Sequence, residues 1–263
     1  MAHEQAATTS LDLAAQTVLV TGSSGGIGRE IALSLARAGA DVVVHGFHNE
    51  PALQQVAKDI RELGRQSLAI RANLADAAEV SRLANEAWQW HGKLDLLVNN
   101  AGADVLTGEA AKGSFEQKLD QLWHVDVVAC MRLSRMVGQQ MRQRGTGGII
   151  NIGWDQAERG MAGDSGEMFG AIKGAVMAFS RSLAQSLAPQ VRVNCLALGW
   201  IRTAWGEKTS GYWQQRATRE SLRERWGTPA DVAAAVRFLA TPAADFITGQ
   251  VIAVNGGFRF GSA

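Results

Sequence analysis

The chain has 263 residues and lacks several features that would point to large or charged partners. Lys and Arg number 26 against 25 Asp and Glu, so there is no basic surplus for a nucleic acid or an anionic membrane. No apolar run reaches the roughly 18 residues that a membrane span needs. Residues 1–16 lack the continuous apolar core of a signal peptide. We therefore expect a cytoplasmic protein that acts on a small-molecule substrate.

Cysteine and tyrosine are also scarce. The only cysteines, Cys130 and Cys195, lie in apolar stretches, which favours buried thiols in a reducing compartment over a disulfide. The only tyrosine is Tyr212. We predict no metal site.

What the chain does have is an alternation of short β-branched runs with longer stretches of helical periodicity. The predicted strands cover 17–21, 41–45, 67–71, 94–98, 148–152, 191–196 and 250–254. The predicted helices cover 27–38, 51–63, 77–90, 115–144, 168–187 and 230–239. This order predicts an α/β protein with a doubly wound, seven-stranded parallel sheet and helices on both faces. We predict one Rossmann-type domain over 13–263, preceded by a flexible segment over 1–12.

A glycine-rich turn follows the first predicted strand and reads Thr21-Gly22-Ser23-Ser24-Gly25-Gly26-Ile27-Gly28. Glycines allow a tight turn and close approach of a pyrophosphate, and the following helix offers free N–H groups. A glycine turn without a ligand is the alternative, but the strand-turn-helix context favours a nucleotide. The predicted pyrophosphate contacts are Gly22, Ser24, Gly25, Gly26, Ile27 and Gly28.

The spacing Thr-Gly-x-x-x-Gly-x-Gly resembles the short-chain dehydrogenase/reductase family, and further matches follow in order. They are Asn73-Leu74, Asn99-Asn100-Ala101-Gly102, Gly199-Trp200-Ile201-Arg202-Thr203 and the closing strand with Asn255-Gly256-Gly257. The resemblance implies adenine contacts at Asn73 and Leu74, ribose contacts at Asn100, Ala101 and Gly102, and nicotinamide contacts at Gly199, Ile201 and Thr203. It also implies a homotetramer or homodimer formed through the helices over 115–144 and 168–187, although burial of their apolar positions against the sheet explains those positions equally well.

The resemblance further implies a substrate lid near 203–226. This segment holds Trp205, Tyr212 and Trp213, which favours an apolar or planar substrate, although packing of a short helix explains the aromatic residues almost as well.

Cofactor choice depends on the end of the second strand, where an acidic residue would select NAD. Gly46, followed by Phe47, takes that place, so we predict NADP, with NAD possible. His45, His48 or Arg29 could lie near the 2′-phosphate, and the alternative for His48 is a solvated loop residue.

The catalytic positions depart from the family. The resemblance implies a serine, a tyrosine, a lysine and an asparagine, and this chain has Trp154, Phe169, Lys173 and Asp126 there. Only Lys173 is retained, and the resemblance implies that it also binds the cofactor, at the nicotinamide ribose. A reductase without the serine and the tyrosine needs another proton donor, because a positioned acid contributes about 10²- to 10⁴-fold in rate.

Two carboxyl groups are candidates for that acid. Asp155 follows Trp154, and Glu167 precedes Phe169; an apolar wall can raise a carboxyl pKa enough for general acid catalysis. The alternative for Glu167 is that Asp164-Ser165-Gly166-Glu167 forms a helix entrance, where capping and the helix dipole favour acids. Tyr212 is a third candidate.

Three function classes remain open at this point. The first is an NADP(H)-dependent oxidoreductase acting on a carbonyl, alcohol or related small molecule. The second is a catalytically silent nucleotide-binding protein or partner subunit. The third is a lyase or isomerase that uses the carboxylates.

Overall fold

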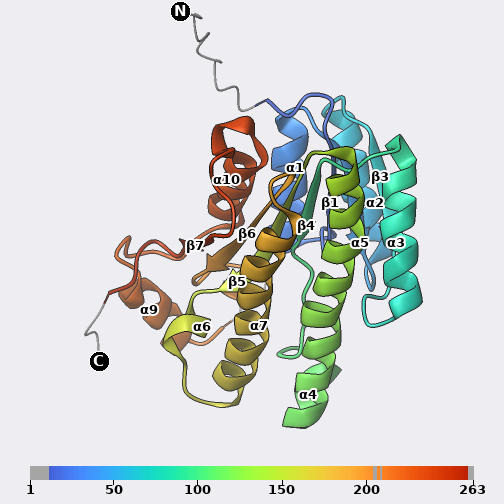
Figure 1. Ribbon diagram of the computed structural model, residues 1–263. Coiled ribbons are helices and arrows are strands. Elements are labelled where there is room, and N and C mark those ends of the chain that lie inside the picture. The colour runs from blue at the N-terminus through green and yellow to red at the C-terminus, as the bar shows by residue number, and fades with distance from the viewer. Residues whose placement is uncertain (1–11, 204–205, 208, 260–263) are drawn as a thin grey trace, which may run out of the picture.

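The seven strands form one parallel sheet in the computed structural model, which describes residues 12–203, 206–207 and 209–259 (Figure 1). The strands are β1 (Thr17–Val20), β2 (Asp41–Gly46), β3 (Ser67–Arg71), β4 (Leu96–Asn99), β5 (Gly147–Trp154), β6 (Val191–Leu198) and β7 (Val251–Val254). Their order is β3-β2-β1-β4-β5-β6-β7, and every neighbouring pair is parallel. The predicted fold class is therefore confirmed.

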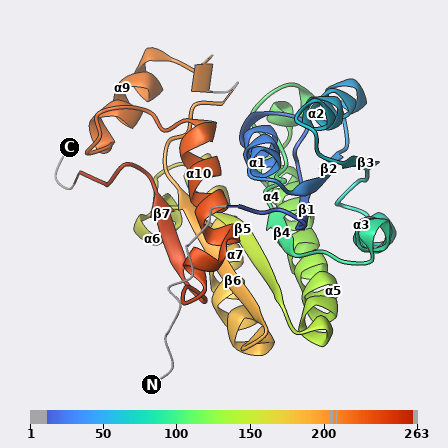
Figure 2. The same ribbon diagram turned by 90° about the horizontal axis from the view of Figure 1, so that it is seen from above.

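The main helices are α1 (Gly26–Arg37), α2 (Glu50–Glu62), α3 (Ala77–His91), α4 (Phe115–Leu122), α5 (Ala129–Arg144), α7 (Asp164–Leu187) and α10 (Pro229–Ala240). Other helices are η1 (Glu109–Lys112), α6 (Gln156–Arg159), α9 (Gly211–Glu220) and η3 (Pro242–Ala244). Seen from above, helices lie on both sides of the row of strands (Figure 2).

One predicted helix is corrected by the structure. The segment 115–144 is not a single α-helix, because the π-helical segment η2 (Trp123–Val128) separates α4 from α5. π-Helical turns inside helices frequently lie at functional sites, and this one carries Asp126. The helix predicted over 168–187 also begins earlier, at Asp164.

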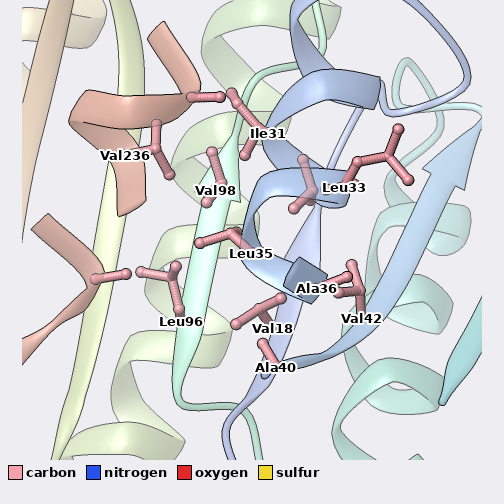
Figure 3. Close-up of a cluster of buried hydrophobic side chains, with 14 of the residues drawn as sticks. Val18, Ile31, Leu33, Leu35, Ala36, Ala40, Val42, Leu96, Val98 and Val236 are labelled. Carbon is pink, nitrogen blue, oxygen red and sulfur yellow. The ribbon is translucent and has the colours of Figure 1, made fainter. Parts of the chain in front are cut away.

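Alternating strand residues explain the two faces of the sheet. Val18 and Val20 of β1 pack in a cluster with residues of α1, α2 and α10, whereas Leu19 packs with α3, α5 and α7. Figure 3 shows part of the first cluster, with Ile31 of α1 and Val236 of α10 close to the strand side chains. Because both faces are covered, the strands are almost continuously apolar.

The topology places the loops that carry the motifs at one edge of the sheet. β1 lies between β2 and β4, so the strand order reverses there, and the loops after β1 and β4 leave the same edge. In open α/β sheets, ligands bind outside the carboxyl ends of the strands at such a switch point.

Three predictions concern the start of the chain, membrane spans and the cysteines. Apart from Asp12, the predicted flexible segment 1–12 lies outside the described residues. Within the described part, no helix is both long and apolar enough to cross a membrane. Cys130 and Cys195 are buried free thiols, as predicted.

Candidate active site

The glycine turn after β1 is built against the loop after β4. Gly22 has a φ of +64°, and a Cβ there would lie 2.7 Å from the Cα of Ala101. A Cβ on Gly28 would lie 2.2 Å from the carbonyl oxygen of Gly22. Both positions therefore need glycine, because any side chain would force the turn, α1 and the neighbouring loop apart.

The N-terminus of α1 is open. Its N-cap, Gly25, makes no side-chain capping hydrogen bond, and the first turn holds no acidic residue. Gly25 and Gly26 are exposed, and a Cβ on either would meet no atom within 4 Å. Free N–H groups and the positive end of the helix dipole thus face open space, an arrangement that fits a pyrophosphate.

Asn100 and Thr21 join the two loops. The side-chain Nδ2 of Asn100 donates to the backbone carbonyl oxygens of Thr21 and Gly22, at 3.0 and 3.2 Å. The Thr21 hydroxyl accepts the N–H groups of Asn100 and Ala101, both at 3.0 Å. The Asn100 side chain thus holds the glycine turn in place.

His45 is part of the scaffold beneath the turn. It is 2% exposed; its Nδ1 accepts the N–H of Gly22 at 3.2 Å, and its Nε2 donates to the carbonyl of Ala72 at 3.0 Å. Burial lowers the pKa of His45 to about 4. A neutral, fully bonded imidazole does not fit the hypothesis that His45 binds a 2′-phosphate.

The other two cations considered for the phosphate are placed differently. Arg29 is paired with Asp59 of α2 at 2.8 Å. His48 is exposed, and its ring centroid lies 4.4 Å from that of Phe47.

Arg71 is the cation that sequence reasoning missed. It ends β3 and is the register partner of Gly46, the last residue of β2. Its Nε donates to the carbonyl of Phe47 at 2.9 Å, and its guanidinium lies 5.0 Å from the Phe47 ring centre. Only the strand pairing brings Arg71 beside Gly46.

Other predicted cofactor residues have clear local roles. Leu74 is buried, and the side-chain oxygen of Asn73 accepts the N–H of Ala75 at 3.0 Å. A Cβ on Gly199 would lie 2.5 Å from the Cβ of Asn255, so β6 can pass the end of β7 only with glycine there. Ile201 forms an isolated bridge with Gly227.

A cavity of about 540 Å³ opens beside these loops. Its lining includes cofactor positions predicted from the resemblance (Ile27, Gly199, Ile201, Thr203) and three of the predicted catalytic positions (Trp154, Phe169, Lys173). The remaining lining residues are Leu106, Ile152, Gly153, Met161, Ser165, Leu198, Trp200, Trp213 and Trp226. Among the described lining residues, none carries a carboxyl group or a phenol.

The only charged side chain among the described lining residues, Lys173, is held in a buried ion pair. Its Nζ lies 2.9 Å from Oδ2 of Asp126, whose side chain is 2% exposed. Burial acts to lower the pKa of Lys173, but the charge and hydrogen bond of Asp126 outweigh it, so the net shift is upward. The lysine is therefore a fixed cation with its own counter-charge.

Asp126 also shapes the loop after β4. Its Oδ1 accepts the N–H of Ala103 at 2.8 Å. A Cβ on Gly102 would lie 2.8 Å from Asp126 Oδ2, so glycine leaves room for this carboxylate. The π-helical segment thus connects the β4 loop to Lys173 of α7.

Two aromatic rings stand at the positions that the resemblance gives to the serine and the tyrosine. Trp154 and Phe169 meet edge to face, with ring centroids 6.3 Å apart. Ser165, Phe169 and Lys173 are spaced one helical turn apart along α7, and all three line the cavity. Ser165 was not identified from the sequence, although its position one helical turn before Phe169 could have indicated that it faces the same cavity.

The three acid candidates lie elsewhere. Asp155 is 5% exposed; its Oδ2 accepts from Asn255 at 2.9 Å and is paired with Arg159. Burial raises the pKa of Asp155, opposed by the bonds from Asn255 and Arg159. Glu167 is exposed in the first turn of α7, and Tyr212 is 61% exposed on α9. None of the three lines the cavity within the described residues.

Trp200 and two tryptophans of the predicted lid, Trp213 and Trp226, line one side of the cavity. Trp200 lies 5.4 Å from Trp213 and 6.2 Å from Trp226, centroid to centroid. Arg216, paired with Glu220, lies 5.7 and 5.2 Å from the Trp200 and Trp213 rings. The third lid aromatic predicted, Trp205, lies outside the described residues.

Comparison with known proteins agrees with this architecture. Residues 22–259 match the family model described as enoyl-(acyl carrier protein) reductase. The 3-oxoacyl-(acyl-carrier-protein) reductase of Staphylococcus aureus is 34% identical over 244 residues, covering 92% of this chain and 97% of the relative. The chain belongs to the short-chain dehydrogenase/reductase family, a family of oxidoreductases.

Solved structures show the same fold. A 7α-hydroxysteroid dehydrogenase complexed with NADH and 7-oxo glycochenodeoxycholic acid has a TM-score of 0.86 and 32% identity, covering 95% of this chain and 96% of that one. A short-chain dehydrogenase from Burkholderia cenocepacia in complex with NADP has a TM-score of 0.83 and 31% identity, covering 93% and 98%.

Proposed function

We propose that this chain is an NADP(H)-dependent oxidoreductase with an atypical active site that acts on a carbonyl, an alcohol or a related small molecule. The observation that carries the proposal is the continuity of two features. The open N-terminus of α1 lies beside the same cavity that Lys173 lines, since Ile27 of α1 is also in the lining. An anion-binding helix end next to an apolar cavity is the geometry of a dinucleotide and substrate site.

The nicotinamide group, when bound, supplies or accepts a hydride. The residues of the chain then have separate tasks. The turn from Gly22 to Gly28 offers N–H groups to the pyrophosphate, and Asn100 keeps that turn rigid. Lys173 is held at the cavity wall by its ion pair with Asp126, and the tryptophans exclude water from the reacting atoms.

The preference for NADP rests on the end of β2. Gly46 offers no carboxylate to repel a 2′-phosphate, and Arg71 stands in register beside it. The guanidinium is held by the Phe47 carbonyl and ring, so little side-chain freedom is lost when it binds an anion. Arg71 replaces His45 and Arg29 as the predicted phosphate ligand.

The proposal is tested by titrating NADPH while following the fluorescence of the eight tryptophans. Gly25→Asp should abolish binding, because it places a carboxylate where the pyrophosphate is expected. Gly25→Ala is the matched control for bulk without charge and should weaken binding less. Gly25 has an extended backbone and open surroundings, so both variants should fold. A flat titration of the unmodified protein would contradict the function.

A catalytically silent nucleotide-binding protein is the second candidate. The observation that favours it is the lining of the cavity, whose described residues offer neither a phenol nor a carboxylic acid. Tight NADPH binding without turnover of ketones, imines or activated alkenes would select it. A lyase or isomerase has less support, because Asp155 and Glu167 do not line the cavity.

A further inference from the structure

The three positions that differ from the family pattern all make the cavity less suited to an anion and more suited to a cation. Where the resemblance implies two hydroxyl donors for a developing oxyanion, the cavity has the rings of Trp154 and Phe169. Where it implies a neutral asparagine, Asp126 adds a negative charge 2.9 Å from Lys173. The site has thus lost groups that stabilise an anion and gained groups that stabilise a cation.

The ion pair sets the net charge of the cavity wall. Lys173 is the only charged residue in the described lining, and an unpaired ammonium there would repel a cationic ligand. Asp126 cancels that charge at contact distance, and its other oxygen is held by Ala103. A cation in this cavity therefore lies beside an ion pair without net charge rather than beside an unpaired ammonium group.

The aromatic rings assigned to a cationic ligand lie in one part of the cavity wall. Arg216 lies near the rings of Trp200 and Trp213, and Arg202 lies 5.9 Å from the Trp226 ring. Those rings already have cationic neighbours. Trp154 and Phe169 face each other edge to face and line the cavity, so they are the rings assigned to a cationic ligand.

From these features, and resting on the proposed function, we infer that the substrate class is a planar organic cation with a C=N⁺ bond, an iminium ion. The iminium carbon accepts a hydride with its two electrons from the reduced nicotinamide, which is left oxidised. A C–H bond forms, and the π pair of the C=N⁺ bond becomes the lone pair of a neutral amine. No proton moves, so the reaction needs neither a tyrosine nor another acid.

The cation-favouring groups act on binding rather than on the chemical step. The positive charge decreases as the hydride arrives, so Asp126 and the two rings stabilise the bound substrate at least as much as the transition state. Removing them should raise KM for the cation without lowering kcat. If these residues had only a structural role, their replacement would change KM and kcat together, or would change the kinetics of cationic and neutral substrates alike.

The test compares two probes of the same bicyclic shape, N-methyl-3,4-dihydroisoquinolinium and 1-tetralone. NADPH oxidation is measured for each, with the rate in the absence of enzyme subtracted. We expect turnover of the iminium with a kcat/KM at least about 100-fold above that of the ketone, because only the ketone needs a proton donor. Quenching of tryptophan fluorescence by each probe alone gives an affinity that does not depend on turnover.

Two variants test the residues. Asp126→Asn and Trp154→Leu should each raise KM and the dissociation constant of the iminium by about 10-fold and leave those of the ketone nearly unchanged. Asp41→Asn is the matched control, since it removes one charge from another ion pair, with Arg65, at the amino end of β2. It should leave the preference between the probes unchanged.

The possible outcomes distinguish the inference of an iminium substrate from the proposed oxidoreductase function. Reduction of the ketone but not the iminium overturns the inference and leaves the oxidoreductase function standing. NADPH binding without reduction of either probe also overturns the inference and favours the silent protein. Absence of NADPH binding overturns both. Equal effects of Asp126→Asn on the two probes would show that the carboxylate only supports the fold.

Discussion

Conversion of this site into a ketone reductase should need three substitutions together, and Phe169→Tyr alone should not suffice. Phe169 lines the cavity one helical turn before Lys173, so a phenol there would face the right space. Lys173, however, is bound to Asp126 at 2.9 Å, and its charge is not free to lower the pKa of a phenol. The Trp154 ring, 6.3 Å from the Phe169 ring, would still occupy the place of a hydroxyl donor.

The expected magnitudes follow from the groups restored. A positioned acid contributes about 10²- to 10⁴-fold, and a donor to the carbonyl oxygen contributes about 10²- to 10³-fold. Phe169→Tyr alone should increase kcat/KM for 1-tetralone by less than about 10-fold, because the second donor is missing and the lysine is paired. With Trp154→Ser added the gain should reach about 10²-fold, and Asp126→Asn should raise it further.

The assay is steady-state NADPH oxidation with 1-tetralone for each single, double and triple variant. NADPH affinity, followed by tryptophan fluorescence, is the control that the nucleotide site is intact. Vigorous ketone reduction by Phe169→Tyr alone would refute the reasoning. It would mean that the pocket lacked one hydroxyl and that neither Trp154 nor Asp126 had remodelled it.

Three further predictions concern other parts of the molecule. Burial lowers the pKa of His45 from 6.5 to about 4, so between these pH values the unfolded state binds more protons than the folded state. The free energy of unfolding should therefore fall by about 3 kcal/mol as the pH decreases from above 6.5 to below 4. Urea unfolding at several pH values should show this slope, and His45→Gln should remove it. Arg71→Ala should weaken NADPH binding by about 10-fold and leave NADH binding unchanged, whereas equal losses would exclude a phosphate contact. Asp155→Asn should change kcat by less than about threefold, since Asp155 is bonded to Asn255 and Arg159 and does not line the cavity. A drop in kcat of about 100-fold or more would restore Asp155 as the acid.

The order of elements was available from the sequence because each has a strong local cause. The inner strands β1, β2 and β4 are buried on both faces and are almost continuously apolar, and short apolar runs located all seven strands. The glycine turn was predictable for a similar reason. Gly22 needs a positive φ, and Gly28 has no space for a side chain.

The helix over 115–144 shows where local reasoning stops. Its periodicity is helical throughout, but η2 shifts the register at Asp126, where the carboxylate bonds to Ala103 and Lys173. These partners come from the loop after β4 and from α7. No window of the sequence contains both of them, so the π-helical segment could not be predicted.

The chain alone thus determined which residue types are present at the site, including the replacement of hydroxyl groups by Trp154 and Phe169. Only the tertiary structure decided their surroundings. It placed Asp155 against Asn255, bonded His45 beneath the glycine turn, and set Arg71 beside Gly46. The physical reason is that burial and the charge of a neighbour depend on contacts between distant segments, whereas strand and turn formation depend on residues next to one another.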